Sequence, residues 1–193
     1  MPLNLPIALT WLRIALIPFI VVLYYIPGGL VSEPLRDAIA AITFIIAALT
    51  DWFDGWLARR WNQTSAFGAF LDPVADKLMV SAALLILLDL GRVDSFIALI
   101  IIGREITISA LREWMAKIGA SGSVAVHQLG KFKTAAQMVA IPCLLYARPL
   151  AGVPLGWIGE VLIIIAAILT VWSMCYYLSR AWPEIRSKSD KTS

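Results

Sequence analysis

The chain has 193 residues, of which 60% are hydrophobic and 15% are charged, and its mean hydropathy is +0.82. Soluble domains average about 25% charged residues, so this composition excludes an ordinary soluble protein, and its hydrophobicity excludes a disordered one. The formal net charge of +3 does not indicate nucleic-acid binding. The length is typical of one domain, and we expect residues 1–193 to form a single transmembrane domain.

Six apolar segments approach or exceed the length that a transmembrane helix needs, which is about 20 mostly apolar residues. Turn-forming glycine and proline residues separate them. We therefore predict an all-α, polytopic membrane protein with six transmembrane helices, the fifth of which extends beyond its apolar stretch. In chain order the segments are residues 7–26, 37–59, 72–88, 93–117, 133–146 and 155–178.

Lysine and arginine are distributed unevenly between the connections. The second and fourth connections and the C-terminal tail together carry ten, whereas the first, third and fifth carry only three, Arg36, Arg92 and Arg148. Cytoplasmic loops of membrane proteins are enriched in these residues. The bias therefore predicts that both termini lie in the cytoplasm.

Four aspartates, Asp51, Asp54, Asp72 and Asp76, lie around the junction of the second and third segments. Spacings of three and four residues place each pair on one helix face, and the connection is short enough to bring the two faces together. Converging carboxylates repel one another unless neutralised, and two divalent cations carry the matching charge. Oxygen ligands suit Mg²⁺ or Mn²⁺ better than zinc, so we predict a dinuclear metal site. For any single aspartate, an ion pair with a nearby arginine or lysine is the alternative.

The aspartates belong to a longer pattern, D-x2-D-G-x2-A-R-x8-G-x3-D-x3-D, which resembles the signature of the CDP-alcohol phosphatidyltransferases. The resemblance implies that the four aspartates hold two metal ions that bind the pyrophosphate of a CDP-linked donor. It also implies that Asp76 acts as the general base on the acceptor alcohol. All eight fixed positions match, namely Asp51, Asp54, Gly55, Ala58, Arg59, Gly68, Asp72 and Asp76.

The same resemblance implies contacts to the CDP donor from five residues, Gly55, Ala58, Arg59, Ser65 and Gly68. The stretch 4–13, followed by Pro18, resembles the N-terminal pattern of this family and adds Thr10 and Arg13 to the donor side. Arg13 could equally be the structural partner of a buried acid. Ile7 stands where the family commonly has asparagine, so we assume no polar contact there.

One face of the fourth segment is polar, because Glu105, Ser109, Arg112 and Glu113 recur at helical spacing. With the lysines that follow Gly130, it predicts a basic pocket suited to a phosphorylated acceptor. Its cations are Arg104, Arg112, Lys131 and Lys133. These stretches resemble the phosphatidylglycerophosphate synthases within the family, which implies sn-glycerol 3-phosphate as the acceptor. A lone histidine, His127, does not by itself indicate catalysis.

We therefore predict an integral-membrane transferase that moves the phosphatidyl group of CDP-diacylglycerol to sn-glycerol 3-phosphate and releases CMP. The alternatives are another acceptor, namely inositol phosphate, serine or phosphatidylglycerol, or a divalent-cation transporter. Transporters typically have inverted repeats and broken helices at the bilayer midplane, whereas these acids lie at segment ends and no repeat is visible. The resemblance also suggests a homodimer in the inner membrane of a bacterium, and the distribution of lysine and arginine predicts that its active site faces the cytoplasm.

Overall fold

The computed structural model describes residues 5–27, 29–61, 66–117 and 128–189. Within these ranges, side chains are described except at 5–7, 54–59, 61, 66–67, 69, 128–131 and 180–189. The described chain folds into six helices and one short hairpin. These elements are α1 Leu5–Tyr25, α2 Glu33–Trp61, α3 Ala66–Asp89, α4 Ser95–Lys117, α5 Gln128–Tyr146, β1 Pro149–Leu150, β2 Val153–Pro154 and α6 Leu155–Ser189.

The prediction of an all-α chain built on six long helices is confirmed. The last helix, α6, extends to Ser189 rather than ending at 178, and α3 begins at Ala66 rather than at Asp72. Residues 66–71 are mostly alanine and large apolar residues, which sustain a helix, and the helix continues through Pro73. Asp72 and Asp76 therefore lie inside a helix. The fifth helix extends beyond its apolar stretch, as expected, because α5 begins at Gln128.

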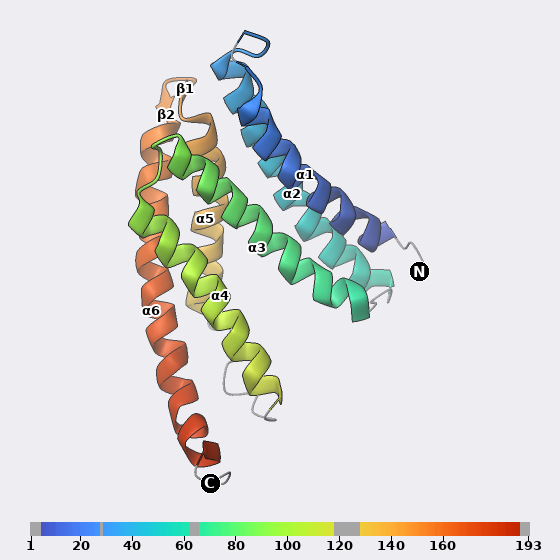
Figure 1. Ribbon diagram of the computed structural model, residues 1–193, viewed down its shortest axis with the longest axis vertical. Coiled ribbons are helices and arrows are strands. Elements are labelled where there is room, and N and C mark those ends of the chain that lie inside the picture. The colour runs from blue at the N-terminus through green and yellow to red at the C-terminus, as the bar shows by residue number, and fades with distance from the viewer. Residues whose placement is uncertain (1–4, 28, 62–65, 118–127, 190–193) are drawn as a thin grey trace.

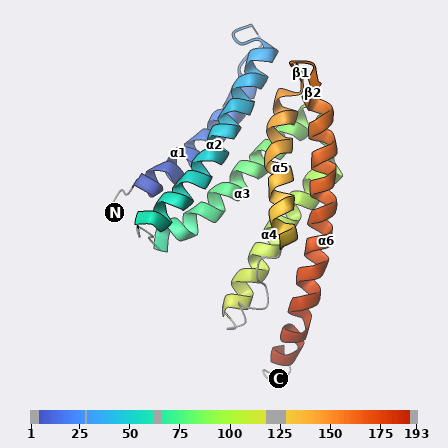
Figure 2. The same ribbon diagram turned by 180° about the vertical axis from the view of Figure 1, so that it is seen from behind.

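The helices form two groups that diverge toward one end of the molecule (Figure 1). Helices α1 and α2 lie side by side, α5 and α6 do the same, and α3 runs between these pairs while α4 packs on α6 (Figures 1 and 2). The α1–α2 connection, the α3–α4 connection and the hairpin lie at the opposite end from the C-terminus. The ends of α2 and α4 therefore point the same way as the C-terminus.

Small side chains allow the helices to approach closely in the core. Ala40, Ala47 and Ala140 are completely buried in a cluster to which all six helices contribute. At Gly159, an added Cβ would lie 2.7 Å from the Cγ of Leu144, which shows how tightly α6 packs on α5. Van der Waals packing of small residues is the usual basis of helix association in apolar surroundings.

A buried ion pair fixes the hairpin end of the molecule. Asp37 is 1% exposed, and its Oδ2 lies 2.7 Å from Nη2 of Arg92. Nη1 of Arg92 donates to the carbonyl oxygens of Leu144 (3.2 Å) and Leu145 (2.5 Å), while the Tyr24 hydroxyl donates to Asp37 Oδ1 (3.2 Å). This network joins α1, α2, α5 and the α3–α4 connection. Arg92, which the sequence analysis treated only as a loop charge, is therefore a structural residue.

The hairpin adds two very short strands to the predicted helical fold. Pro149 pairs with Pro154 and Leu150 with Val153 in an antiparallel register. Between them, Ala151 (φ 51°) and Gly152 (φ 83°) both have positive φ, as a two-residue type I′ turn requires. The sequence indicated a turn here, and pairing across two residues converts it into a hairpin.

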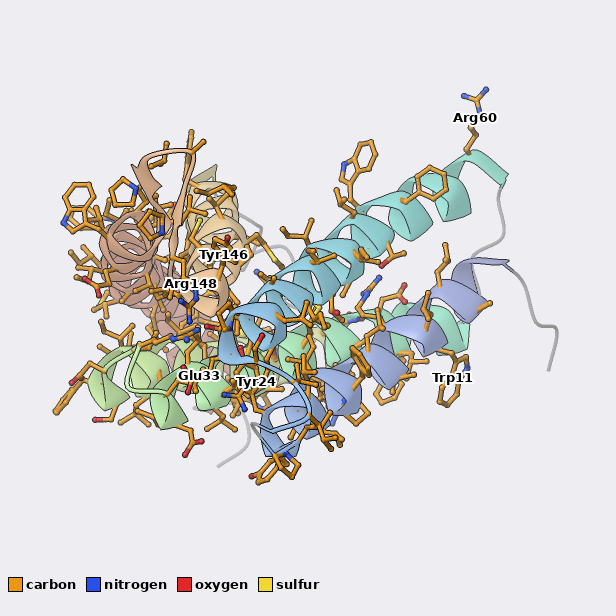
Figure 3. All side chains as sticks on the ribbon, turned by 90° about the horizontal axis from the view of Figure 1, so that it is seen from above. Trp11, Tyr24, Glu33, Arg60, Tyr146 and Arg148 are labelled. Atoms are coloured by element: carbon orange, nitrogen blue, oxygen red, sulfur yellow. The ribbon has the colours of Figure 1, made fainter. Side chains whose placement is uncertain are left out.

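Large apolar side chains cover much of the outer surface. Ile42, Phe96 and Leu99 are among those more than half exposed, and Trp11 points away from the bundle (Figure 3). Within the described residues, two helices contain a stretch long and apolar enough to cross a membrane, Ala8–Tyr25 of α1 and Leu155–Ser179 of α6. The six-span topology therefore stays a prediction.

Candidate active site

Arg13 of α1 joins two of the four predicted aspartates. Its side chain is completely buried, and its Nη1 lies 2.7 Å from Asp51 Oδ1 and 2.8 Å from Asp76 Oδ1. The two carboxylates come from α2 and α3 and are about one-third exposed, 32% and 35%. Asp51 and Asp76 thus converge on a single cationic nitrogen, so a positive charge already occupies the position between them.

Thr10 brings the third aspartate to the same helix. Its hydroxyl donates to Asp72 Oδ1 at 2.6 Å, and Thr10 itself is buried. Thr10 and Arg13 are three residues apart, so they lie on one face of α1. That face is directed at the aspartates of α2 and α3. Both residues were predicted to contact the donor. The alternative for Arg13 was an ion pair with an acidic residue, and the structure contains such ion pairs.

Several predicted site residues lie outside the described side chains, namely Asp54, Gly55, Ala58, Arg59, Ser65 and Lys131, together with Ile7 and His127. Gly68 is described and is buried. Among the described residues, no three acidic, histidine or cysteine side chains are gathered to hold a metal ion. The dinuclear site therefore stays a prediction. Its chemistry is consistent with the donors present, since Asp51, Asp72 and Asp76 supply only oxygen ligands, which Mg²⁺ and Mn²⁺ prefer.

A cavity of about 390 Å³ lies between α3, α4 and α5 and opens beside Asp76. Two of the predicted acceptor cations, Arg104 and Arg112, line this cavity together with Asp76. The helices thus bring the predicted base and two basic residues to the same space. The other polar residues that line the cavity are Lys77, Glu105, Ser109, Thr134 and Gln137.

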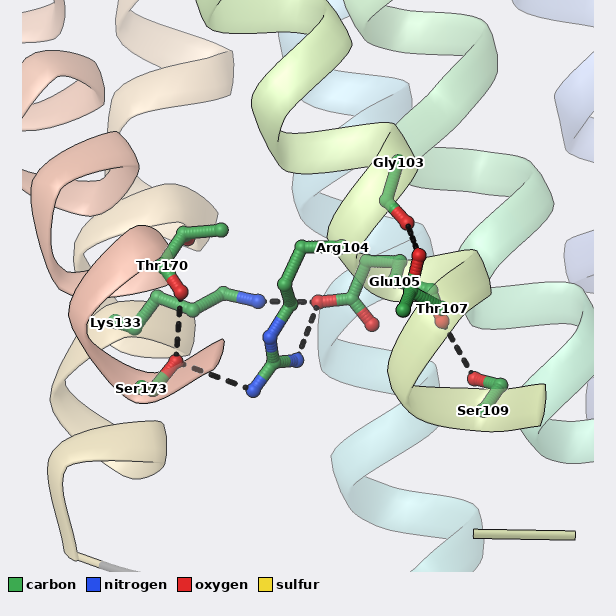
Figure 4. Close-up of polar contacts among 8 residues, drawn as sticks. All are labelled: Gly103, Arg104, Glu105, Thr107, Ser109, Lys133, Thr170 and Ser173. Carbon is green, nitrogen blue, oxygen red and sulfur yellow. Dashed lines mark hydrogen bonds and ion pairs between the residues drawn. The ribbon is translucent and has the colours of Figure 1, made fainter. Parts of the chain in front are cut away.

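Glu105 gathers two buried cations at one oxygen. Its Oε1 accepts a hydrogen bond from Arg104 Nη1 at 3.1 Å and another from Lys133 Nζ (Figure 4). Arg104 Nη2 also donates to Ser173 Oγ of α6 at 3.4 Å, and Ser173 donates to the Thr170 carbonyl oxygen at 3.0 Å. Buried charges are tolerated when they are paired and hydrogen-bonded, as these are. The cluster links α4, α5 and α6, and its members Arg104 and Glu105 line the cavity.

The acceptor residues predicted from the sequence thus divide into two kinds. Arg104 and Arg112 line the cavity, whereas Lys133 is 2% exposed, binds Glu105 and is not among the lining residues. Gln137, which was not among the predicted site residues, is buried and lines the cavity. Its position four residues after Lys133 on α5 was the available signal, because such residues share a helix face.

Comparison with known proteins identifies a family for this chain. Residues 3–172 match the CDP-alcohol phosphatidyltransferase family. Similar proteins named CDP-diacylglycerol–glycerol-3-phosphate 3-phosphatidyltransferase occur in several bacteria. The one from Yersinia enterocolitica is 51% identical over 187 residues, covering 96% of this chain and 98% of the relative. Those from Salmonella typhimurium and Shigella flexneri are 50% and 49% identical, each covering 94% of this chain and 96% of the relative. The chain belongs to the CDP-alcohol phosphatidyltransferase family.

Proposed function

We propose that the protein transfers the phosphatidyl group of CDP-diacylglycerol to sn-glycerol 3-phosphate, giving phosphatidylglycerophosphate and CMP. The observation that carries this proposal is the cavity lined by Asp76, Arg104 and Arg112. It offers a carboxylate that can take a proton beside cations that can bind a phosphate group. The relatives named above, which cover nearly the whole chain, bear the name of the same reaction.

The charge around the cavity is the reason to propose a phosphate ester as the acceptor. The cavity lining carries three cations, Lys77, Arg104 and Arg112, and two carboxylates, Asp76 and Glu105. The Lys133 ammonium bound to Glu105 brings the formal charge to +2. A phosphate monoester carries about −1.5 to −2 at neutral pH and accepts several charge-assisted hydrogen bonds. Glycerol 3-phosphate satisfies this requirement, and inositol phosphate is the competitor that would satisfy it too.

We propose that two divalent cations, Mg²⁺ or Mn²⁺, are held by Asp51, Asp54, Asp72 and Asp76. The convergence of Asp51 and Asp76 on one cationic nitrogen supports this, because their oxygens are already directed at a positive charge. Bound there, the cations would polarise phosphoryl oxygens and neutralise charge on the departing CMP. The donor pyrophosphate would then lie beside the acceptor cavity, since Asp76 belongs to both.

The residues of the chain perform the remaining steps. Arg104 and Arg112 hold the acceptor phosphate, so that a primary hydroxyl of the same molecule points toward Asp76. The Asp76 carboxylate accepts the hydroxyl proton as the oxygen bonds to the phosphorus that carries diacylglycerol. The bond from that phosphorus to the CMP oxygen breaks, and CMP leaves with the electron pair. Gly55, Ala58, Arg59, Ser65 and Gly68 contact the CDP part of the donor.

We further propose that residues 1–193 form one membrane domain with six spans, both termini and the site in the cytoplasm. The distribution of polarity supports this proposal. Large apolar side chains face outward, while Arg13, Asp37 and Arg104 are buried inside. Charged residues in membrane spans usually face the bundle interior in this way. The bacterial relatives are consistent with an inner-membrane location, and the family resemblance with a homodimer.

An acceptor panel tests the proposed function. Purified protein is mixed with CDP-diacylglycerol in detergent micelles with Mg²⁺, and CMP release is measured with glycerol 3-phosphate, glycerol, inositol phosphate, serine and phosphatidylglycerol in turn. We expect release with glycerol 3-phosphate, and none in excess chelator. Equal release with unphosphorylated glycerol would contradict the phosphate pocket, and release in chelator would contradict the metal site.

A further inference from the structure

One aromatic ring of α6 lies beneath both arginines of the acceptor cavity. The guanidinium carbon of Arg104 lies 5.9 Å from the centroid of the Tyr177 ring, and that of Arg112 lies 5.8 Å from it. Tyr177 is 1% exposed and packs with Ile108 and Met115 of α4. The face of an aromatic ring attracts a guanidinium group within about 6 Å of its centroid. Tyr177 is therefore placed to interact with both cations.

The ring matters because the backbone positions of the two arginines are far apart on α4. They are eight residues apart on α4, which corresponds to about 12 Å along the helix axis. An arginine side chain has many rotamers, and restricting them before a ligand binds lowers the entropic cost of binding. Tyr177 gives both side chains a common contact. Ser173, one turn earlier on α6, adds the hydrogen bond from Arg104.

We propose that Tyr177 is a positioning residue for acceptor binding, whose ring holds Arg104 and Arg112 in the orientation that binds the acceptor phosphate. Tyr177 is not among the residues that line the cavity, so it acts through the arginines. It also follows residue 172, the last residue of the family match. The inference rests on the proposed function, because it assumes a phosphorylated acceptor.

Steady-state kinetics of Tyr177→Leu tests this role. CMP release is measured against glycerol 3-phosphate at saturating CDP-diacylglycerol, and then against the donor at saturating acceptor. We expect the KM for glycerol 3-phosphate to rise about tenfold, because two cation–π contacts are lost. The kcat and the KM for the donor should stay within about twofold of the parent values, since the ring contacts on which the proposal rests are those to the two acceptor arginines.

Two further variants separate positioning from folding. Tyr177→Phe keeps the ring and should restore the parent KM for glycerol 3-phosphate. Trp172→Leu removes an exposed aromatic ring from the same helix and should leave both KM values unchanged. If the leucine variant does not fold, Tyr177→Met replaces it, since methionine fills a similar apolar volume without a ring.

The outcomes decide between the inference and the function on which it rests. If the parent releases CMP with glycerol 3-phosphate and Tyr177→Leu has the parent KM, only the positioning role is wrong. An equal rise in both KM values, or a phenylalanine variant as impaired as the leucine one, would also overturn it. Loss of folding in both the leucine and methionine variants would make the ring a structural requirement and overturn the proposal. If the parent releases no CMP with glycerol 3-phosphate, the proposed function and this inference both fail.

Discussion

Replacing Arg13 by alanine should reveal whether the aspartate site binds a divalent metal, without any measurement of activity. In the parent, Arg13 Nη1 contacts Asp51 at 2.7 Å and Asp76 at 2.8 Å. A hydrogen bond to a charged group contributes about 1.5–3 kcal/mol, and the partial exposure of both carboxylates favours the lower end. We therefore expect the metal-free Arg13→Ala protein to lose about 2 kcal/mol. For a chain of this size, that is about 4–8 °C in Tm.

Divalent metal should reverse much of this loss. Mg²⁺ at a hundred times its Kd stabilises a folded protein by about 2.7 kcal/mol. At the proposed site, metal and Arg13 would compete for the same carboxylate oxygens in the parent, whereas in Arg13→Ala the guanidinium would no longer compete. The increase in Tm on adding Mg²⁺ should therefore be larger for the variant than for the parent. The assay is thermal unfolding in detergent with and without Mg²⁺.

Arg92→Ala is the matched control. It breaks the buried ion pair with Asp37 at the hairpin end of the molecule, and Asp37 is not one of the four predicted metal ligands. Leaving one partner of a buried pair uncompensated costs about 3–5 kcal/mol, so this variant should also unfold at a lower temperature. Adding Mg²⁺ should raise the Tm of Arg92→Ala by no more than it raises the Tm of the parent. An Mg²⁺ response of Arg13→Ala no larger than that of the parent would refute the reasoning.

Three other substitutions test separate parts of the account. Arg112→Ala should lower kcat/KM for glycerol 3-phosphate about tenfold to a hundredfold, with an unchanged KM for CDP-diacylglycerol; equal effects on both substrates would count against an acceptor role. Asp76→Asn should still bind the donor but lose about 10²–10⁴-fold in turnover, and turnover within tenfold of the parent would remove Asp76 as the base. Gly159→Ala places a Cβ 2.7 Å from Leu144 Cγ and should cost about 1–3 kcal/mol of stability in thermal unfolding. Gly103→Ala, where nothing lies within 4 Å, should keep Tm or raise it slightly, because alanine favours a helix more than glycine does, and it provides the control for Gly159.

The helices were predictable because long apolar segments between glycine and proline residues form few structures other than helices. The same local reasoning identified the polar face of α4, and three of its residues, Glu105, Ser109 and Arg112, line the cavity beside Asp76. Helix periodicity fixes which residues share a face, so this part of the site follows from spacing alone. The start of α3 was placed too late, because an aspartate followed by a proline resembles a helix start.

Contacts between helices could not be predicted from spacing. Arg13 is separated from Asp76 by more than sixty residues, and the sequence left open whether it binds the donor or an acid. Lys133 was assigned to the acceptor, and its ion pair with Glu105 of α4 could not be anticipated from the sequence. Both outcomes depend on how α1, α3, α4 and α5 pack, which local patterns do not encode. Tyr177 was missed for the same reason, since an aromatic residue in an apolar helix resembles ordinary core packing.

The central claim is that the acceptor hydroxyl attacks the phosphorus that carries diacylglycerol while the acceptor phosphate is bound in the cavity. The most direct test uses sn-glycerol 3-phosphate labelled with ¹⁸O in its free primary hydroxyl, with CDP-diacylglycerol and Mg²⁺, and mass spectrometry of both products. We predict that phosphatidylglycerophosphate retains the label and that an equal amount of unlabelled CMP is released. Phosphatidic acid together with a labelled cytidine-containing product would mean attack at the other phosphorus and would contradict the account.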